Sequence, residues 1–476
     1  MNRTIIQLSM AVALAAIGLS SCVPALKMQE ARKNTPPSYA TSTDSTDAAA
    51  LPWKQFFKDP HLRTLIDSAL ANDQELNIML QEITIAQNEA RARKGEYLPF
   101  VDLGAGAGVE KVGRYTRNGV VEDELRVEDD KEFPEPLPDF LVQARASWEL
   151  DIWKKLRNAK QAAVLRYLGT VEGRNFTVTH IVTEVATSYY ELIALDNQLE
   201  ILQNNIAIQK DALEIVKLEK QAAKVTELAV RRFEAEVLKN QSMQFDIQQR
   251  IVETENRINF LLGRYPQHVD RNSKGFAELV PDSLSAGVPA QLLTHRPDIR
   301  QAELALSAAK LDVKAAKASF YPSLRLTAGI GLNAISTDYL VRTPQSMIYN
   351  AAGELVAPLI NRNALKAAYA SANARQTQAV YDYERAVLNA YVEVVNQLSN
   401  ISNLRKSYEL RRQQVDALSS SITISTNLFR SARADYMEVL LTQRDALESK
   451  FDLVETRMQQ MNAMVNMYQA LGGGWR

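Results

Sequence analysis

Few residues of this chain have both the type and the spacing that catalysis or metal binding requires. The chain has four histidines, which are His61, His180, His268 and His295. They lie far apart, and no spacing among them matches a metal-ligand motif. Gly104, Gly106 and Gly108 could suggest a phosphate loop, but they alternate with alanine or valine inside a predicted strand. The sequence therefore predicts no catalytic residue, no metal site and no cofactor, and indicates that the chain is not an enzyme.

Cys22 has a clearer chemical role, because it is the only cysteine and has no partner for a disulfide. It follows a short basic start and a mostly apolar run from Ile5 to Leu19. This run is shorter than the roughly 20 apolar residues of a spanning helix, so residues 1–21 are predicted to be a signal peptide. The Leu-Ser-Ser-Cys ending resembles the bacterial lipobox, whose cysteine becomes the mature N-terminus and carries acyl chains such as palmitate. An ordinary signal peptide with an incidental cysteine is the alternative.

The residues after the signal peptide predict an anchored and flexible start. Two or more acyl chains would hold Cys22 at a membrane, since each buried methylene contributes roughly 0.8 kcal/mol. Residues 22–51, rich in Ser, Thr, Asp and Ala, are predicted to be a lipidated N-terminus and a flexible tether. The net charge of -1 over 476 residues gives no reason to expect nucleic acid as a partner.

Four segments alternate between apolar and polar residues, as strands with two different faces do. They cover 101–109, 140–152, 323–332 and 346–360. Long alternating strands with an aromatic residue such as Trp148 toward one end are typical of a transmembrane β-barrel. A soluble sandwich is the alternative, and the long acidic segment from Gly113 to Pro138 favours the barrel because it suits a solvated outer loop.

Four strands cannot close a barrel. Single-chain barrels begin at about eight strands, and an open sheet edge in lipid leaves backbone groups unpaired. The sequence therefore predicts that the barrel is shared between chains.

Two long stretches without proline are predicted to be helical hairpins. The first runs from Lys154 to Tyr265 and the second from Leu359 to the C-terminus, with turns expected near residues 224 and 433. A single helix from 154 to about 222 would be roughly 100 Å long. Shorter helices are predicted over 62–93 and 298–318.

The first hairpin also contains the 3.5-residue period of a coiled coil, from Ile181 to Ile206. Leucines on this seam need neighbouring helices, and we expect other chains to bury Leu192, Leu195, Leu199 and Leu202.

These helices and strands occur in two copies of one passage. Residues 76–108 match 299–331 at an offset of 223, with Pro99 on Pro322. The offset then falls to 209, which places Val230 on Val439. We therefore predict a tandem structural repeat. Its parts are a first repeat over 52–265, an equatorial linker over 266–295 and a second repeat over 296–476.

Four motifs in this order resemble the TolC-like outer-membrane efflux proteins, specifically the NodT/OprM-like lipoprotein branch that serves resistance-nodulation-division (RND) multidrug efflux pumps. The motifs are Trp53-Lys54-Gln55-Phe56-Phe57-Lys58-Asp59-Pro60, Trp148-Glu149-Leu150-Asp151-Ile152-Trp153, Arg296-Pro297-Asp298-Ile299 and Ala318-Ser319-Phe320-Tyr321-Pro322-Ser323-Leu324. The resemblance covers residue 52 to the C-terminus.

The resemblance implies an α+β membrane protein that assembles as a homotrimer. Three copies of four strands would form a transmembrane β-barrel of twelve strands, continuous with a coiled-coil α-helical tunnel in the periplasm. The implied location is the outer membrane of a Gram-negative bacterium, in contact with outer-membrane lipid. The implied partners are a periplasmic adaptor and an inner-membrane RND pump, whose expelled substrates the channel conducts passively. Segments 52–70 and 264–295 would build an equatorial belt.

Family members close the periplasmic end of the tunnel with inward-facing acidic residues and polar contacts between helices. The resemblance places this gate at the two hairpin turns, where the candidate residues are Lys224, Glu227, Arg430, Arg433, Asp435 and Glu438. One of the two acidic positions of the family is kept as Glu438, whereas the other is Leu441. Three Glu438 carboxylates on an axis would favour cations. The alternative is that these charged residues only solvate a turn.

Three other functions are compatible with parts of the sequence. An exit duct of a type I protein secretion system would use the same fold, but the lipobox favours the pump branch. A periplasmic adaptor has a single hairpin, so the duplication argues against it. A coiled-coil scaffold without a lumen does not explain four alternating strands.

Overall fold

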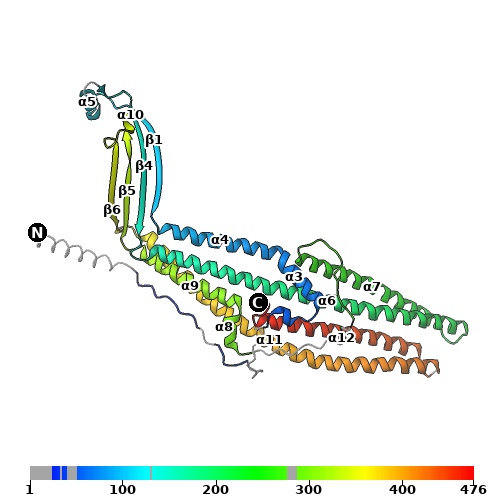
Figure 1. The fold of residues 1–476 in the computed structure, drawn as a ribbon. Helices are drawn as coiled ribbons and strands as arrows, with labels where there is room; N and C mark the ends of the chain where they lie inside the picture. The colour runs from blue at the N-terminus through cyan, green and yellow to red at the C-terminus, as the bar shows by residue number, and fades with distance from the viewer. Residues whose placement is uncertain are drawn as a thin grey trace. The chain divides into compact units, whose positions relative to one another are not determined.

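The computed structural model describes residues 24–32, 35–39, 51–128, 131–274, 276, 287–431 and 433–475. Cys22 and the signal peptide predicted over 1–21 lie outside these residues. The chain divides into two compact units, drawn as one ribbon in Figure 1. The first unit contains residues 1–30, 84–167 and 304–380, and the second contains 31–83, 168–303 and 381–476.

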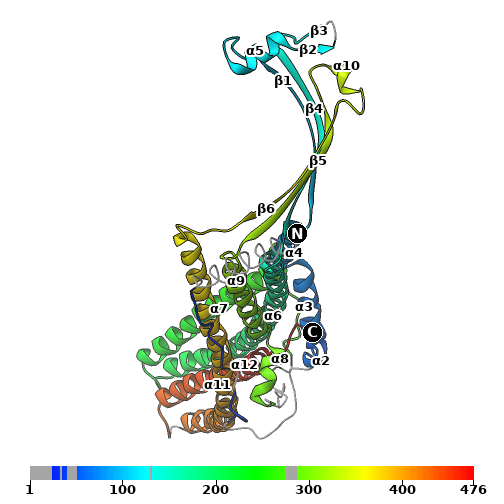
Figure 2. The same cartoon turned by 90° about the vertical axis from the view of Figure 1, so that its left-hand side faces the viewer.

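The first unit contains an antiparallel sheet whose strands follow the order β1 (Phe100–Glu110), β4 (Leu137–Leu150), β5 (Ser323–Ala334) and β6 (Met347–Val356), as Figure 1 shows. Figure 2 shows the same strands from a second side. All four predicted strands are therefore present. The second strand begins at residue 137 rather than 140, and the fourth ends at residue 356 rather than 360. Pro358 follows β6 closely and has no N–H for the strand ladder, which explains the earlier end.

The connections between paired strands contain short elements. The segment between β1 and β4 holds α5 (Arg117–Glu124) and a small hairpin of β2 (Arg126–Glu128) and β3 (Lys131–Glu132). The sequence predicts only a solvated loop here. A helix forms because the Thr116 hydroxyl accepts a hydrogen bond from the Gly119 N–H at 3.2 Å, which caps its first turn. The segment between β5 and β6 contains α10 (Thr337–Leu340).

A helix precedes each pair of strands. α4 (Gln74–Glu96) leads to β1, and α9 (Pro297–Ala318) leads to β5. The sequence predicts one helix over 62–93, but the structure divides it into α3 (Pro60–Asn72) and α4. Asp73 causes the break, because its ψ of 131° is not helical and its carboxylate accepts a hydrogen bond from the Leu76 N–H at 2.8 Å.

The longest helices form two hairpins. α6 (Lys155–Gln221) returns as α7 (Glu227–Leu261), and α11 (Asn363–Arg430) returns as α12 (Tyr436–Ala470), which confirms the predicted turns. With 67 residues, α6 extends about 100 Å. Among the helices of the described residues, none is both long enough and apolar enough to cross a bilayer. The remaining helices are short and comprise α2 (Trp53–Phe56), η3 (Pro289–Gln291) and α8 (Leu292–His295).

The interior of the second unit buries the predicted seam of α6. Leu192 and Leu202 are 0% exposed. Leu192 lies in a cluster with side chains of α3, α7 and α12, and Leu202 packs with Ile247 of α7 and Leu447 of α12. The expectation that other chains bury this seam is therefore wrong. Helices of the same chain cover it, because residues close to the N-terminus and to the C-terminus pack on α6.

The element bounds follow the two sequence offsets. α4 begins at residue 74 and α9 at 297, while β1 begins at 100 and β5 at 323, both 223 residues later. α7 and α12 both have 35 residues and begin 209 residues apart. Each is followed by a glycine with positive φ, Gly263 at 63° and Gly472 at 91°, a conformation that favours glycine and ends both helices alike.

Part of the predicted tether contacts α11. The backbone of Gln29 forms two hydrogen bonds with the amide of Gln376, donating at 3.0 Å and accepting at 2.7 Å. Tyr39 is 1% exposed and stacks on Tyr391 with ring centroids 5.5 Å apart. These described residues of the segment are held by specific contacts, which differs from the flexible tether predicted over 22–51.

Candidate functional site

The four-stranded sheet has one apolar face and one polar face. Strand register places Leu103, Ala144, Ile330 and Tyr349 side by side across all four strands. Leu103 is 85% exposed and Tyr349 is 82% exposed, although both are apolar. An exposed apolar band of this kind marks a surface that contacts lipid or another protein.

Both edges of this sheet are open. β1 and β6 are the outer strands, and neither pairs with a further strand among the described residues. Every residue of β6 is exposed. Each edge therefore presents a row of unpaired N–H and C=O groups, which is a template for pairing with another chain.

The polar face carries charged side chains close to glycines. Asp102 on β1 lies opposite Arg145 on β4, and the Arg145 Nε donates to the Asp102 carboxylate at 3.3 Å. Nearer the end of β4, Glu149 accepts a hydrogen bond from Lys155 at 2.6 Å. The two faces therefore differ in chemistry as the alternating sequence predicts, and the polar one suits contact with water.

The turn of the first hairpin places Lys224 and Glu227 at the surface. Glu227 forms ion pairs with Lys220 and with Arg231, the latter at 2.9 Å. The hydrogen bond from Lys220 has the largest effect on the pKa of Glu227 and lowers it, and Arg231 lowers it further. Glu227 is thus neutralised by basic residues of its own hairpin.

The turn of the second hairpin places the other four predicted gate residues. Asp435 caps α12, because its carboxylate accepts a hydrogen bond from the Met437 N–H at 3.4 Å. Arg430, Arg433 and Glu438 are exposed and form no ion pair with any residue that the structure describes. Their charges are therefore available to a partner outside the chain.

Apolar side chains join the two hairpins near their turns. Val230 and Phe233 of α7 pack in one cluster with Leu440 of α12. The Arg232 guanidinium also donates to the Met437 sulfur at 2.8 Å. The structure thus brings the two turns together through residues that the sequence does not mark, and the predicted gate residues of one hairpin form no ion pair with those of the other among the described contacts.

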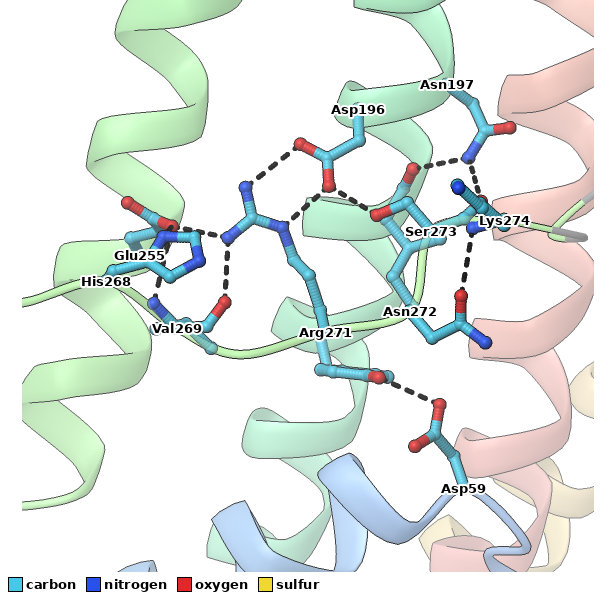
Figure 3. A network of polar contacts seen from close by, with 12 residues as sticks. Asp59, Asp196, Asn197, Glu255, His268, Val269, Arg271, Asn272, Ser273 and Lys274 are labelled. Carbon is cyan, nitrogen blue, oxygen red and sulfur yellow. Dashed lines mark hydrogen bonds and ion pairs between the residues drawn. The ribbon is translucent and has the colours of Figure 1, made fainter.

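A polar network centred on Arg271 holds the segment that follows α7 (Figure 3). Arg271 donates to both carboxylate oxygens of Asp196 on α6, at 2.6 and 3.0 Å, and to Glu255 on α7. It also donates to the Val269 carbonyl at 2.9 Å. Burial opposes the charged form of Arg271, but the hydrogen bonds that it donates to Asp196 and Glu255 outweigh this effect and raise the pKa of Arg271.

The same network includes Asp59, whose carboxylate accepts from the Tyr189 hydroxyl at 2.8 Å and also caps α3 (Figure 3). Asp59 belongs to a predicted motif, but Asp196, Glu255 and Arg271 do not. Arg271 lies 75 residues from Asp196 and 16 from Glu255, so no local spacing could have identified the network.

Arg296 forms a second buried cluster in the same unit. Its side chain is 7% exposed, pairs with Asp298 at 2.7 Å and Glu393 at 2.5 Å, and donates to the Ala470 carbonyl at 3.0 Å. Burial works against its charge, yet these partners raise the pKa of Arg296. Arg296 and Asp298 stand in the predicted Arg-Pro-Asp motif, which was the one sequence signal for this cluster.

Two of the four histidines lie close to an acidic residue. His180 lies 3.4 Å from Glu184 on the same helix, and His268 lies 3.1 Å from Glu255. Within the described ranges, no group of three or more His, Cys, Asp or Glu side chains is placed to hold a metal ion.

Residues 65–264 and 288–473 match the model of a family described as outer membrane efflux protein. The chain is 30% identical over 455 residues to the solvent efflux pump outer membrane protein SrpC of Pseudomonas putida, which covers 95% of this chain and 94% of SrpC. It is 25% identical over 464 residues to the cation efflux system protein CusC of Escherichia coli (strain K12), with 96% and 98% covered.

The fold is similar to that of a solved outer-membrane channel. The open state of the Neisseria gonorrhoeae MtrE outer membrane channel superposes with a TM-score of 0.83 at 22% identity, covering 96% of this chain and 99% of MtrE. The agreement extends over nearly the whole length of both chains.

Proposed function

Because the chain belongs to the outer membrane efflux protein family, we propose that it is the outer-membrane channel of a tripartite efflux system. The family consists of efflux channels of the Gram-negative outer membrane that extend into the periplasm, and the chain is not an enzyme. In the proposed system the channel passively conducts substrates that an inner-membrane RND pump expels through a periplasmic adaptor. The similarity to SrpC, a solvent efflux pump outer membrane protein, and to CusC, a cation efflux system protein, supports this assignment.

The observation that carries the proposal is the open sheet with two unlike faces. A sheet in lipid must close, since unpaired backbone groups in hydrocarbon cost several kcal/mol each. Four strands per chain require partners, and three chains would supply a barrel of twelve strands. The face of Leu103 and Tyr349 would contact lipid, and the face of Asp102 and Arg145 would line the lumen.

The helical hairpins would continue this channel as a periplasmic tunnel. The matching bounds of α7 and α12 support a tandem duplication, so each chain would supply two similar hairpins. Large apolar side chains remain exposed on these helices, including Phe245 at 68% and Leu410 at 68%. Neighbouring chains in a homotrimer would cover them. Residues 266–274 of the equatorial linker would pack outside the tunnel, where Arg271 joins them to α6 and α7.

The gate at the hairpin turns forms a second part of the proposal. Arg430, Arg433 and Glu438 have free charges for contacts with the next subunit, while Asp435 caps a helix and Glu227 is paired within its hairpin. Lys224 is exposed beside Glu227. Exposed pairs contribute about 0.2 to 1 kcal/mol each, so three copies of such contacts could be broken by adaptor docking.

Cys22 is proposed to be acylated and to form the mature N-terminus. The hydrogen-bonded segment from Gln29 onward leaves only a few residues between this anchor and α11. Mass spectrometry of the mature protein is expected to find a lipidated Cys22, and Cys22→Ala should lose the lipid while the sheet still forms. An unmodified peptide that runs through Cys22 would contradict this assignment.

Two adjacent residues of β1 provide the test of the channel. Ala105 lies on the apolar face, and Gly106 lies on the polar face with no atom near an added Cβ. Native mass spectrometry in detergent is expected to find a trimer for the parent protein and for Gly106→Lys. Ala105→Lys should impair assembly, because a lysine facing lipid costs about 2 to 4 kcal/mol near the bilayer midplane.

The proposal fails if the parent protein is a folded monomer with its full β-sheet signal. It also fails if both lysine variants assemble equally well, since the two faces would then not separate lipid from water.

A further inference from the structure

One row of residues crosses all four strands on the polar face of the sheet. Strand register pairs Asp102 with Arg145, Arg145 with Gly329, and Gly329 with Asn350. The row therefore presents a carboxylate, a guanidinium, a position without a side chain and an amide. Arg145 is the only cation in it.

The guanidinium of Arg145 is only partly neutralised. Its Nε donates to Asp102 at 3.3 Å, and its two terminal nitrogens have no hydrogen-bond partner among the residues that the structure describes. The side chain of Arg145 is 58% exposed. The two terminal nitrogens can therefore donate hydrogen bonds to a solute on this face.

Glycines allow the polar side chains to lie along the wall. A Cβ added to Gly104 would lie 3.4 Å from the Arg145 Nη2, so the guanidinium covers this glycine of β1. A Cβ added to Gly329 would collide with the Asn350 Oδ1, so the amide of Asn350 covers the glycine on β5. The guanidinium of Arg145 therefore lies over a β1 position that has no side chain.

Most other charged residues on this face are acidic. The carboxylates of its four strands come from Asp102, Glu110, Asp139, Glu149 and Glu354. The second arginine, Arg325, lies in register between Glu149 and Glu354 and so faces two carboxylates, whereas Arg145 faces one. Arg145 is thus the less compensated of the two arginines on this face.

We propose, on the premise of the channel described above, that Arg145 is the residue through which the barrel wall admits anionic solutes such as carboxylates. In a trimer, three copies of Arg145 would place three separate guanidinium groups among the acidic side chains of the lumen. A solute carboxylate would accept hydrogen bonds from the two free guanidinium nitrogens while Asp102 keeps the Nε in place. Gly104 and Gly329 keep the passage wide at this level.

The test places a single thiol two residues from Arg145. Ser147→Cys lies on the same face of β4, and the chain has no cysteine other than Cys22, so the parent protein serves as the blank. In proteoliposomes at low salt, the thiol is treated with an anionic and with a cationic methanethiosulfonate reagent. Residues 145 and 147 are separated by roughly 7 Å, and at this distance in water one charge changes the rate of thiol modification by a factor of about 2.5. The charge of Arg145 speeds the anionic reagent and slows the cationic one, so the ratio of the two rates should fall about sixfold in Arg145→Gln.

Three controls separate this inference from other effects. Arg145→Lys should keep the ratio close to that of Arg145, because it keeps the charge. Arg114→Gln removes an arginine from the connection between β1 and β4 and should leave the ratio unchanged. Ala146→Cys, which faces the apolar side, should react slowly with both reagents.

The outcomes distinguish the two levels of the proposal. If Ser147→Cys reacts but the ratio is the same in Arg145→Gln, the role of Arg145 is refuted while the channel stands. If Ala146→Cys reacts and Ser147→Cys does not, the polar face does not line water, and both the channel orientation and this inference are overturned.

Discussion

Replacing Arg271 by glutamine is expected to release residues 264–274 from α6 and α7. The Arg271 side chain is 10% exposed, and its partners Asp196 and Glu255 are 22% and 16% exposed. Removing one partner of a buried ion pair costs 3 to 5 kcal/mol, because the remaining charge stays desolvated. Since these carboxylates keep some contact with water, we expect about 3 kcal/mol, which changes a local opening equilibrium roughly a hundredfold.

Limited trypsin digestion measures this opening directly. Arg264 and Lys274 lie at the two ends of the segment and remain as cleavage sites in the variant. When opening and closing are fast relative to cleavage, the cleavage rate follows the population of the open form. Cleavage at these two sites should therefore be about a hundredfold faster in Arg271→Gln, while sites elsewhere in the protein keep their rates.

Neutralising the two carboxylates that pair with Arg271 should reverse the increase in cleavage rate. A variant that combines Arg271→Gln with Asp196→Asn and Glu255→Gln leaves no unpaired buried charge, so its cleavage rate should return most of the way to that of the parent. Arg231→Gln breaks an ion pair whose arginine is 67% exposed and serves as the surface control. A cleavage rate in Arg271→Gln within twofold of the parent would refute the view that this network holds the segment.

Three further predictions concern the sheet, the start of α6 and the turns. Gly331→Ala should lower the midpoint of heat-induced unfolding and cost about 3 kcal/mol, because its Cβ would lie 2.7 Å from the Gln143 Cα, whereas Gly106→Ala should be neutral. Asp151→Ala should cost about 2 kcal/mol in the same assay, because Asp151 accepts hydrogen bonds from the Leu156 N–H at 3.0 Å and the Arg157 N–H at 2.9 Å. Burial alone would raise the pKa of Asp151, but these hydrogen bonds lower it. The contribution of Asp151 to stability is therefore fully present above the ordinary aspartate pKa and is lost as the pH falls through the lowered pKa. A loss of stability in Asp151→Ala that does not become smaller in acid would contradict this. Arg430→Ala with Arg433→Ala should raise single-channel conductance in planar bilayers, and Glu438→Gln should weaken block by polyvalent cations; no change in either would place the constriction elsewhere.

Periodicity alone was sufficient to locate the strands and the long hairpins. In segments such as 323–332, apolar and polar residues alternate with a period of two, which predicts a strand. The absence of proline from 154 to 265 permits one long helix and a second helix that runs back along it. The break at Asp73 was missed, because the helical pattern continues through it and only the capping hydrogen bond to the Leu76 N–H ends one helix and starts the next.

The sequence by itself determined the four long strands, the two helical hairpins, their duplication and the two unlike faces of the sheet, since these depend on neighbouring residues and on a comparison of the chain with itself. Only the tertiary structure decided which partners the elements meet. It showed that helices of the same chain bury Leu192 and Leu202, and that Arg271 joins carboxylates from α6 and α7. It also showed that Glu227 is paired within its own hairpin. The physical reason is that a buried contact or an ion pair is fixed by distances between residues far apart in the sequence, and no local pattern encodes those distances.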